Sequence, residues 1–255
     1  MNIPPRVITS NQELFSNYDE LQAGDIISGR IRLRPGEEHL LTDLSQRGIR
    51  MIPSATAQLA SRSKCFQTRL FGNEMVPHSR VIYDIHAMLD TMNLYHRHQV
   101  TKVVVKDDAK DGGFGIFLFR DIEEVYFHAA NSQLSYPFVV QPFVSDCRDI
   151  RAIFLGDYHE AYERSNPDNF RNNLHCGGSA TPLSLSREQL ELCHRVLKRG
   201  SFDYGHIDLM VAPDGKSYLA EINLRGGIRG AQIKAAEYRQ RLDNVHEQLV
   251  REITA

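Results

Sequence analysis

Three polar residues in the stretch HIDLMVAPDGKSYLAEIN have the types and spacing of a cation site. The pair Asp214-Gly215 is typical of a two-residue hairpin turn, so the flanking segments are expected to pair as strands. Counting back from this turn places Asp208 opposite Glu221, and Asn223 shares a face with Glu221 because side chains alternate along a strand. Facing carboxylates repel unless a cation lies between them, and two carboxylates with an amide oxygen suit Mg²⁺. The alternative is a solvated hairpin face with the register shifted by one residue.

A lysine followed by closely spaced glycines has the composition of a phosphate-binding loop. Lys106 ends the run KVVVK, and Gly112, Gly113 and Gly115 follow it. Glycines let backbone N–H groups approach phosphate oxygens, and the lysine adds a positive charge. A flexible hairpin tip explains the same residues equally well, and the segment is not a P-loop because the GK[ST] ending is absent.

The run FVVQPFV at 138–144 is expected to be a strand with polar backbone groups available to the edge of an adenine ring. Pro142 has no N–H but keeps a carbonyl that accepts hydrogen bonds, while Phe143 and Val144 keep their donors. An ordinary edge strand is the alternative interpretation.

Several arginines have the chemistry of an anion clamp. Asp149 and Arg151 share one strand face, Arg164 and Arg171 follow, and Arg225 comes directly after the predicted cation site. Guanidinium groups bind phosphate or carboxylate through paired hydrogen bonds. Ordinary surface ion pairs would use the same residues.

The overall composition is that of a globular protein. The chain has 255 residues, 42% hydrophobic and 24% charged, which is ample for a large core. A net charge of -2 argues against nucleic acid as the partner, because no basic excess neutralises phosphates. No apolar run approaches membrane-spanning length, and the N-terminus lacks the layout of a signal peptide. The four scattered cysteines suit reduced thiols, so we expect a cytoplasmic protein without a membrane partner.

The apolar periodicity predicts both helices and strands. Strands are expected at 25–30, 49–52, 102–106, 116–119, 138–144, 149–155 and 158–164, and in the hairpin described above. Helices are expected after Pro35-Gly36, over 55–71, around 85–92, from Ser186 and over 231–253. Because several neighbouring strands are joined by short turns, we expect an α+β fold with largely antiparallel sheets.

Taken in order, these motifs resemble the ATP-grasp superfamily, and most closely its RimK-like branch of carboxylate–amine ligases. The resemblance runs from about Ser54, and its most specific part is the series QPFV, RDIRAIFLG, FRNNLHCGGSA, IDLM and AEIN. It implies an ATP-grasp fold in which two α+β lobes grip ATP. Residues 1–53 would be a shortened N-terminal α/β segment, 54–137 the small lobe with the phosphate loop, and 138–255 the hinge strand and large lobe with the metal site. Such a short first segment leaves open a homodimer or a partner subunit that completes the acceptor site.

The resemblance also implies a role for each matching residue. Those expected to contact ATP are Lys64, Lys106, Gly112, Gly113, Gly115, Gln141, Pro142, Phe143, Val144, Asp149, Arg171, Asn172 and Asn173. Asp208, Glu221 and Asn223 fall on the ligands of Mg²⁺, for which Mn²⁺ could substitute. Arg171 and Arg225 would stabilise the charge on the transferred phosphoryl group.

Four positions depart from the family pattern. Pro142 stands where the hinge commonly has Glu, Lys110 where the phosphate loop has Gly, and Cys176 where Arg is expected. The sequence LRGG replaces SPG after Asn223. The ATP-binding half is therefore intact by motif, while the acceptor half is altered.

The activity implied is an ATP- and Mg²⁺-dependent ligation of a carboxylate to an amine through an acyl phosphate. The substrate would be an amino acid, a peptide or a small carboxylate. Two alternatives stay open: a kinase of the same fold that phosphorylates a small molecule, and a non-catalytic nucleotide-binding subunit.

Overall fold

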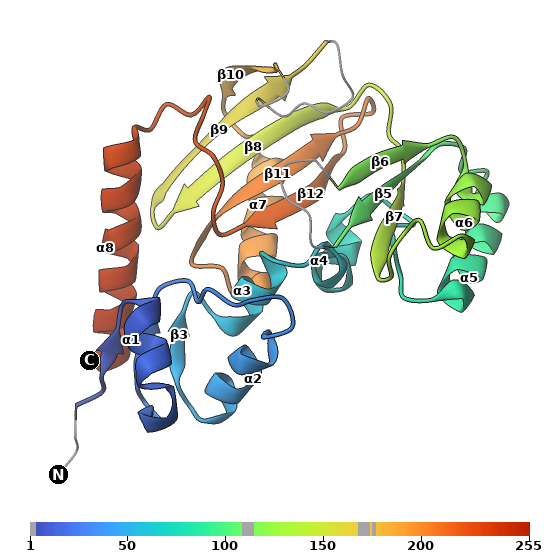
Figure 1. Ribbon diagram of the computed structural model, residues 1–255. Coiled ribbons are helices and arrows are strands. Elements are labelled where there is room, and N and C mark those ends of the chain that lie inside the picture. The colour runs from blue at the N-terminus through green and yellow to red at the C-terminus, as the bar shows by residue number, and fades with distance from the viewer. Residues whose placement is uncertain (1–3, 109–114, 168–173, 175–176) are drawn as a thin grey trace.

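The computed structural model describes residues 4–108, 115–167, 174 and 177–255. Their strands form three separate sheets, of three, four and five strands, with helices packed around them (Figure 1). The two larger sheets are antiparallel throughout. The predicted α+β class with largely antiparallel sheets is confirmed.

The N-terminal sheet is small and parallel. Its strands, in spatial order, are β1 (Val7–Ile8), β2 (Ile26–Ser28) and β3 (Arg50–Ile52). The helices of this region are α1 (Asn11–Ser16), the short 3-10 helix η1 (Tyr18–Glu20) and α2 (His39–Gln46). Leu41 and Leu44 of α2 are fully buried, as their spacing predicts.

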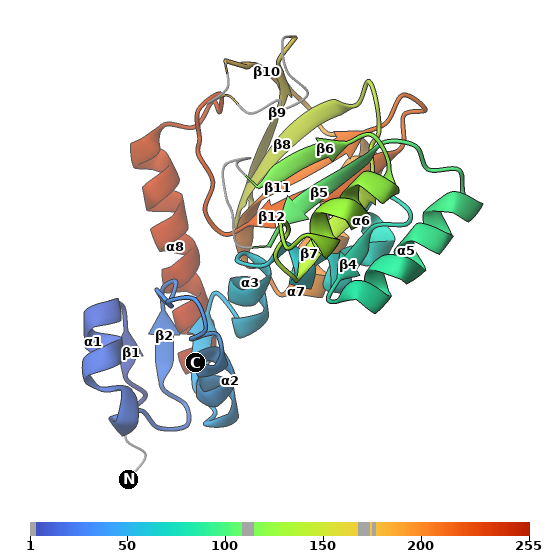
Figure 2. The same ribbon diagram turned by 45° about the vertical axis from the view of Figure 1, so that its right-hand side comes forward.

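The four-stranded sheet has the order β4-β7-β5-β6. Its strands are β4 (Arg80–Ile82), β5 (Val103–Asp107), β6 (Ile116–Phe119) and β7 (Phe138–Pro142). Helices α5 (Ile85–Arg97) and α6 (Ile122–Ala130) cover it (Figure 2). Met88 and Tyr95 of α5 and Val125 of α6 are fully buried in its core, so this sheet with its two helices has a hydrophobic core of its own.

The five-stranded sheet has the order β10-β9-β8-β11-β12. Its strands are β8 (Arg148–Leu155), β9 (Tyr158–Ser165), β10 (Ser179–Leu183), β11 (Tyr204–Val211) and β12 (Ser217–Asn223). Helix α7 (Arg187–Gly200) buries Cys193 and Val196 in the core of this sheet, and its start carries the predicted capping box of Ser186 and Gln189. Helix α8 (Ala235–Thr254) contacts both β8 and β2, so it joins the large sheet to the N-terminal sheet (Figure 1).

The segment between the N-terminal sheet and β4 forms two helices and a turn, α3 (Ala55–Ala60), α4 (Lys64–Phe71) and the 3-10 helix η2 (Gly72–Glu74). The prediction of one helix over 55–71 is therefore wrong. Ser63 has an extended backbone, and its hydroxyl accepts a hydrogen bond from the N–H of Phe66, which starts a new helix there. Helix α4 contacts β4 and β7 of one sheet and β12 of the other, so it lies between the two larger sheets.

None of the described helices combines the length and the apolar character that a membrane crossing requires.

Candidate active site

The β11–β12 hairpin has the predicted register around Asp208 and Glu221, although its turn differs from the one predicted. Asp208 lies opposite Glu221, as predicted, and His206 lies opposite Asn223. At the other end Val211 pairs with Ser217, which leaves a loop longer than the two-residue turn expected from the sequence. The N–H of Gly215 donates to the Ala212 carbonyl at 2.8 Å.

The physical reason lies in the backbone of Gly215, which has a φ of 87°. A turn whose last residue is left-handed gives a longer hairpin loop than a two-residue turn. A β-bulge between Asp208 and Leu209 then shifts the pairing by one residue and restores the predicted register. The longer turn and the β-bulge thus shift the register in opposite directions, so the pairing of Asp208 with Glu221 is the predicted one.

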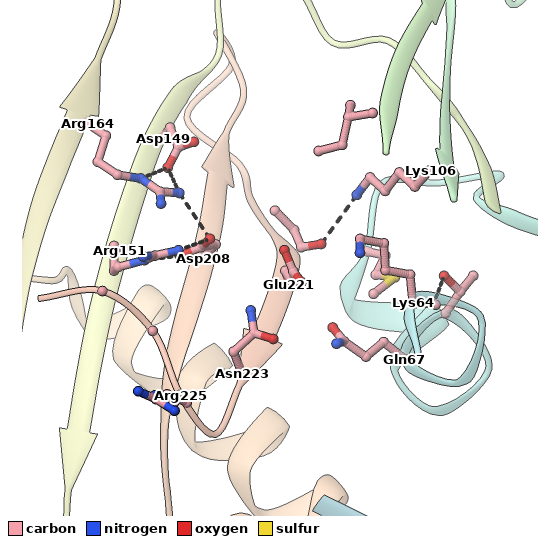
Figure 3. A pocket seen from close by; sticks show the side chains of 16 residues that line it. Lys64, Gln67, Lys106, Asp149, Arg151, Arg164, Asp208, Glu221, Asn223 and Arg225 are labelled. Atoms are coloured by element: carbon pink, nitrogen blue, oxygen red, sulfur yellow. Dashed lines mark hydrogen bonds and ion pairs between the residues drawn. The ribbon is translucent and has the colours of Figure 1, made fainter. Parts of the chain in front are cut away.

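A cavity of about 270 Å³ lies between this hairpin, α4 and β5 (Figure 3). Its polar lining includes Lys64, Gln67, Lys106, Asp149, Arg151, Arg164, Asp208, Glu221, Asn223 and Arg225. Figure 3 shows Glu221 between Asp208 and Lys106, with Asn223 below it. The three predicted metal ligands, both predicted lysines and Arg225 therefore line one cavity, although they come from segments far apart in the sequence.

Asp208 is the most strongly paired group in the cavity. Its two carboxylate oxygens accept from Nε and Nη2 of Arg151, each at 2.7 Å, and Nη2 of Arg164 lies 3.1 Å from it. Arg164 also donates from Nε to Asp149 at 2.9 Å. Burial raises the pKa of Asp208, but the two arginine charges outweigh burial and hold this pKa well below its ordinary value. Asp208 is therefore ionised whenever the protein is folded near neutral pH.

Lys106 reaches across from β5 to the hairpin. Its Nζ donates to the carbonyl of Ala220 at 3.3 Å. Burial lowers the pKa of Lys106 to about 8, and the nearby carboxylates of Glu221 and Asp208 oppose this shift. The lysine is thus a cation next to two carboxylates, with a proton that it releases more easily than an exposed lysine does.

Lys64 is the first residue of α4, and Asp108 holds this end of the helix in place. A carboxylate oxygen of Asp108 accepts from the N–H of Cys65 at 2.7 Å and from the Ser63 hydroxyl at 2.9 Å. Asp108 follows β5 directly, so the strand that carries Lys106 is tied to the helix that carries Lys64. The sequence reasoning missed Asp108, because nothing in a lone aspartate after a strand identifies its partner.

Gln67 was missed as well. Its side chain accepts from the N–H of Ile222 at 2.9 Å and donates to the carbonyl of Ile222 at 3.0 Å. It is 2% exposed. This pair of bonds fixes α4 against β12 between Glu221 and Asn223. A polar residue one helical turn after Lys64 was the available signal, because such spacing places both side chains on one face.

Other predicted residues lie elsewhere. Gly112, Gly113, Arg171, Asn172 and Asn173 fall outside the described residues. The carbonyl of Gly115 accepts from the N–H of Asp107 at 2.8 Å, which closes the β5–β6 hairpin.

The hinge prediction needs one correction. Gln141, Pro142, Phe143 and Val144 are not among the residues that line the cavity. The N–H of Phe143 donates to the Lys102 carbonyl at 2.9 Å, so this donor is not free for a ligand as expected. The reason is that sheet pairing with the start of β5 continues past the end of β7.

The oxygen donors of the cavity decide whether it fits a magnesium ion. Among the described residues, no group of three His, Cys, Asp or Glu side chains is arranged to hold a metal ion. The hairpin offers two carboxylates and one amide, which is a set of hard oxygen donors. Glu221 and Asn223 make no side-chain hydrogen bond or ion pair with another described residue, while Asp208 is held by arginines. The residues fit a divalent ion that binds together with an anion, because the anion can pair with Arg151 and Arg164 in place of Asp208.

Comparison with known proteins identifies the family of this chain. Residues 61–244 match the RimK-like ATP-grasp domain. A probable alpha-L-glutamate ligase of Haemophilus ducreyi is 29% identical over 151 residues, which is 57% of this chain and 49% of that protein. The chain spans about half the length of the curated relatives it matches.

Two solved structures share the fold. The D-alanine-D-alanine ligase from Coxiella burnetii superposes with a TM-score of 0.62 and 14% identity, over 88% of this chain and 68% of that one. The ATP-grasp ligase PsnB, in complex with a minimal precursor, Mg and ADP, gives a TM-score of 0.56 and 20% identity, over 83% and 66% of the two chains. Because the family match covers most of the sequence, the chain belongs to the RimK-like ATP-grasp family.

Proposed function

We propose that the protein is an ATP- and Mg²⁺-dependent ligase that joins a carboxylate to an amine. The observation that carries this proposal is the single cavity that gathers Lys64, Lys106 and the oxygen donors of the β11–β12 hairpin. Cations on one wall and hard oxygen donors on the other suit a nucleotide triphosphate with its divalent ion. The names of the curated relatives and of the solved structures support the same reaction class.

Different residues of this cavity would bind the phosphates and the metal. Lys64 and Lys106 would neutralise phosphate charge, and Asp208, Glu221 and Asn223 would hold Mg²⁺. The ion would neutralise charge on the β- and γ-phosphates. Asp149, the glycine segment around Gly112, Gly113 and Gly115, the hinge positions Gln141, Pro142 and Val144, and the segment 171–173 remain proposed ATP contacts.

The reaction would proceed in two steps. An oxygen of the substrate carboxylate attacks the γ-phosphorus, the bond from that phosphorus to the bridging oxygen breaks, and ADP leaves with the electron pair. The amine then attacks the carbonyl carbon of the acyl phosphate, loses a proton and expels inorganic phosphate. Arg225, which lines the cavity, and Arg171 would stabilise the negative charge that develops in the first step.

Glutamate is the first substrate to test, because a curated relative is a probable alpha-L-glutamate ligase. Arginines in and beside the cavity suit acidic substrates. A cytoplasmic location and a second subunit at the acceptor site also remain proposals. The free thiols of Cys65, Cys147 and Cys193 support the first, and sedimentation analysis would test the second.

An ADP-release screen over amino acids and small carboxylates, with and without hydroxylamine, tests the proposal. We expect Mg²⁺-dependent ADP release with at least one carboxylate, and capture of a hydroxamate when hydroxylamine replaces the amine. A phosphorylated product that survives hydroxylamine would identify a kinase instead. ADP that binds with no turnover on any member of the pools would favour a non-catalytic subunit.

A further inference from the structure

The segment that joins β12 to α8 carries Arg225 past the cavity. Figure 3 shows Arg225 below Asn223, where this segment leaves β12. The residue before it is anchored, because the N–H of Leu224 donates to the Ser61 hydroxyl at 3.0 Å and Leu224 is 2% exposed. Within the described part of the chain, the side chain of Arg225 makes no hydrogen bond or ion pair. The position of its guanidinium therefore depends on how the backbone on either side of it is held.

His206 supports the backbone directly after Arg225. It lies on the same face of β11 as Asp208, because side chains alternate along a strand, and it is 1% exposed. A Cβ atom added to Gly226 would lie only 2.5 Å from Nδ1 and 2.7 Å from Cγ of the imidazole ring. The backbone of Gly226 thus rests directly on this ring, closer than any residue with a side chain could approach.

The ring of His206 has little freedom to move away from this contact. Its Nε2 lies 2.9 Å from the hydroxyl of Tyr238 on α8, and its backbone pairs with Asn223 on one side and Ile153 on the other. The other ring nitrogen, Nδ1, is buried and has no hydrogen-bond partner among the described residues. Burying such an atom without a partner is unfavourable, so packing alone does not explain a histidine at this position.

Gly226 is required by this contact and not by its own backbone. Neither Gly226 nor its neighbour Gly227 has a positive φ, so alanine suits the backbone of both. A Cβ atom on Gly227 would meet no atom within 4 Å. The two adjacent glycines therefore differ in their contact with His206, and this makes them a matched pair for an experiment.

We propose that His206 is a positioning residue for Arg225. Its ring, held by Tyr238, supports Gly226 and so fixes the direction in which the Arg225 side chain enters the cavity. The inference rests on the function proposed above, because that function assigns to Arg225 the negative charge that develops as the phosphoryl group is transferred. His206 itself does not line the cavity and would act only through the segment that it supports.

A double-mutant cycle in the full chain tests this proposal. The assay is ADP release with ATP, Mg²⁺, hydroxylamine as the amine and the carboxylate that turns over in the screen above, L-glutamate first. Gly226→Ala should lower kcat at least about tenfold, because small misplacements of a catalytic group cost up to about a hundredfold. Its KM for ATP should stay within about twofold of wild type, since both lysines remain in place.

The decisive variant combines His206→Ala with Gly226→Ala. It should turn over at least about fivefold faster than Gly226→Ala alone, because the ring that the new methyl group meets is gone. Gly227→Ala is the control, and its effect, whatever its size, should simply add to that of His206→Ala. A double variant no faster than Gly226→Ala, or equal coupling at Gly227, would overturn the inference.

Hydrogen exchange of the backbone amides at 224–230 gives a second readout that needs no turnover. His206→Ala should speed exchange in this segment and leave the β5–β6 hairpin unchanged, while His194→Ala, at an exposed histidine of α7, should match wild type. Tyr238→Phe, which removes only the hydroxyl that holds the ring, should act like His206→Ala to a smaller degree and serves if that variant does not fold.

Unchanged exchange at 224–230 in His206→Ala and in Tyr238→Phe would contradict the support that we assign to the ring. If wild type releases no ADP with any carboxylate, the proposed function falls instead, and the exchange data still decide whether His206 holds the segment that carries Arg225.

Discussion

Asp208 is at once a proposed magnesium ligand and the partner of two arginines, of which Arg164 is buried and Arg151 is partly exposed. Removing its charge by Asp208→Asn would leave Arg164, only 4% exposed, next to a weaker acceptor. Breaking a buried ion pair in this way costs about 3–5 kcal/mol, so we expect a loss of unfolding free energy of that order. Urea denaturation of the variant and of wild type measures this loss.

Glu221→Gln is the cleaner probe of the metal, because Glu221 makes no ion pair with a described residue. It should keep the unfolding free energy within about 0.5 kcal/mol of wild type, as expected of a site without such pairs. Its Mg²⁺-dependent turnover should nevertheless fall sharply. A variant with full turnover at limiting Mg²⁺ would contradict the proposal that Glu221 is a magnesium ligand.

Lys106 gives a prediction about pH. Phosphate binding favours the protonated lysine, and in the free protein burial lowers its pKa to about 8. The affinity for ADP should therefore fall as the pH rises through about 8, well below the range where an exposed lysine loses its proton. Lys106→Met should bind ADP more weakly and show no such decline, whereas Lys102→Met, an exposed lysine before the same strand, should follow wild type. A pH-independent affinity in wild type would contradict a phosphate contact at Lys106.

Helix α4 is positioned by Gln67 rather than by apolar packing alone. Gln67→Leu would leave both backbone groups of Ile222 without their side-chain partner. An unsatisfied buried polar group costs about 1–3 kcal/mol, so we expect lower stability together with a higher KM for ATP as Lys64 shifts. Gln240→Leu on the exposed side of α8 is the control and should change neither. Loss of stability with an unchanged KM would show that Gln67 does not position the site.

The same elements show what the sequence could predict. Periodicity and turn residues correctly predicted both strands of the β11–β12 hairpin, and the pairing of Asp208 with Glu221 follows from local register. The turn itself and the break between α3 and α4 escaped prediction, because one left-handed glycine and one serine cap decide them. Those local choices compete closely in energy, and periodicity carries no information about them.

Contacts between segments far apart in the sequence were the other features that could not be predicted. The partners of Asp208 lie on β8 and β9, and Gln67 bonds to a residue far along the chain. Such pairs depend on how the sheets pack, which neither spacing nor composition encodes. The family resemblance supplied residue types for the cavity, but the ion pairs that hold Asp208 emerge only when β8, β9 and β11 are adjacent.

The arrangement of the two larger sheets around the cavity leads to a last prediction, on how the binding of metal and the binding of nucleotide depend on each other. Arg151 and Arg164 from the large sheet already neutralise Asp208, so a lone cation gains little from that carboxylate. Phosphate oxygens held by Lys64 and Lys106 across the cavity would offer the arginines a new partner and free Asp208 for the ion. We therefore expect Mg²⁺ or Mn²⁺ to bind at least about tenfold more tightly when ADP is present, within the usual range of coupling between two sites.

Titration of Mn²⁺, followed by its paramagnetic signal with and without ADP, measures this coupling directly. Linkage requires that the metal strengthen ADP binding by the same factor, which calorimetry checks independently. Lys106→Met should reduce both factors, because it removes a phosphate contact on the opposite sheet while the hairpin oxygens stay in place. Equal Mn²⁺ affinity with and without ADP would mean that the ion pairs of Asp208 do not oppose the metal, and the hairpin would then be a metal site independent of the nucleotide.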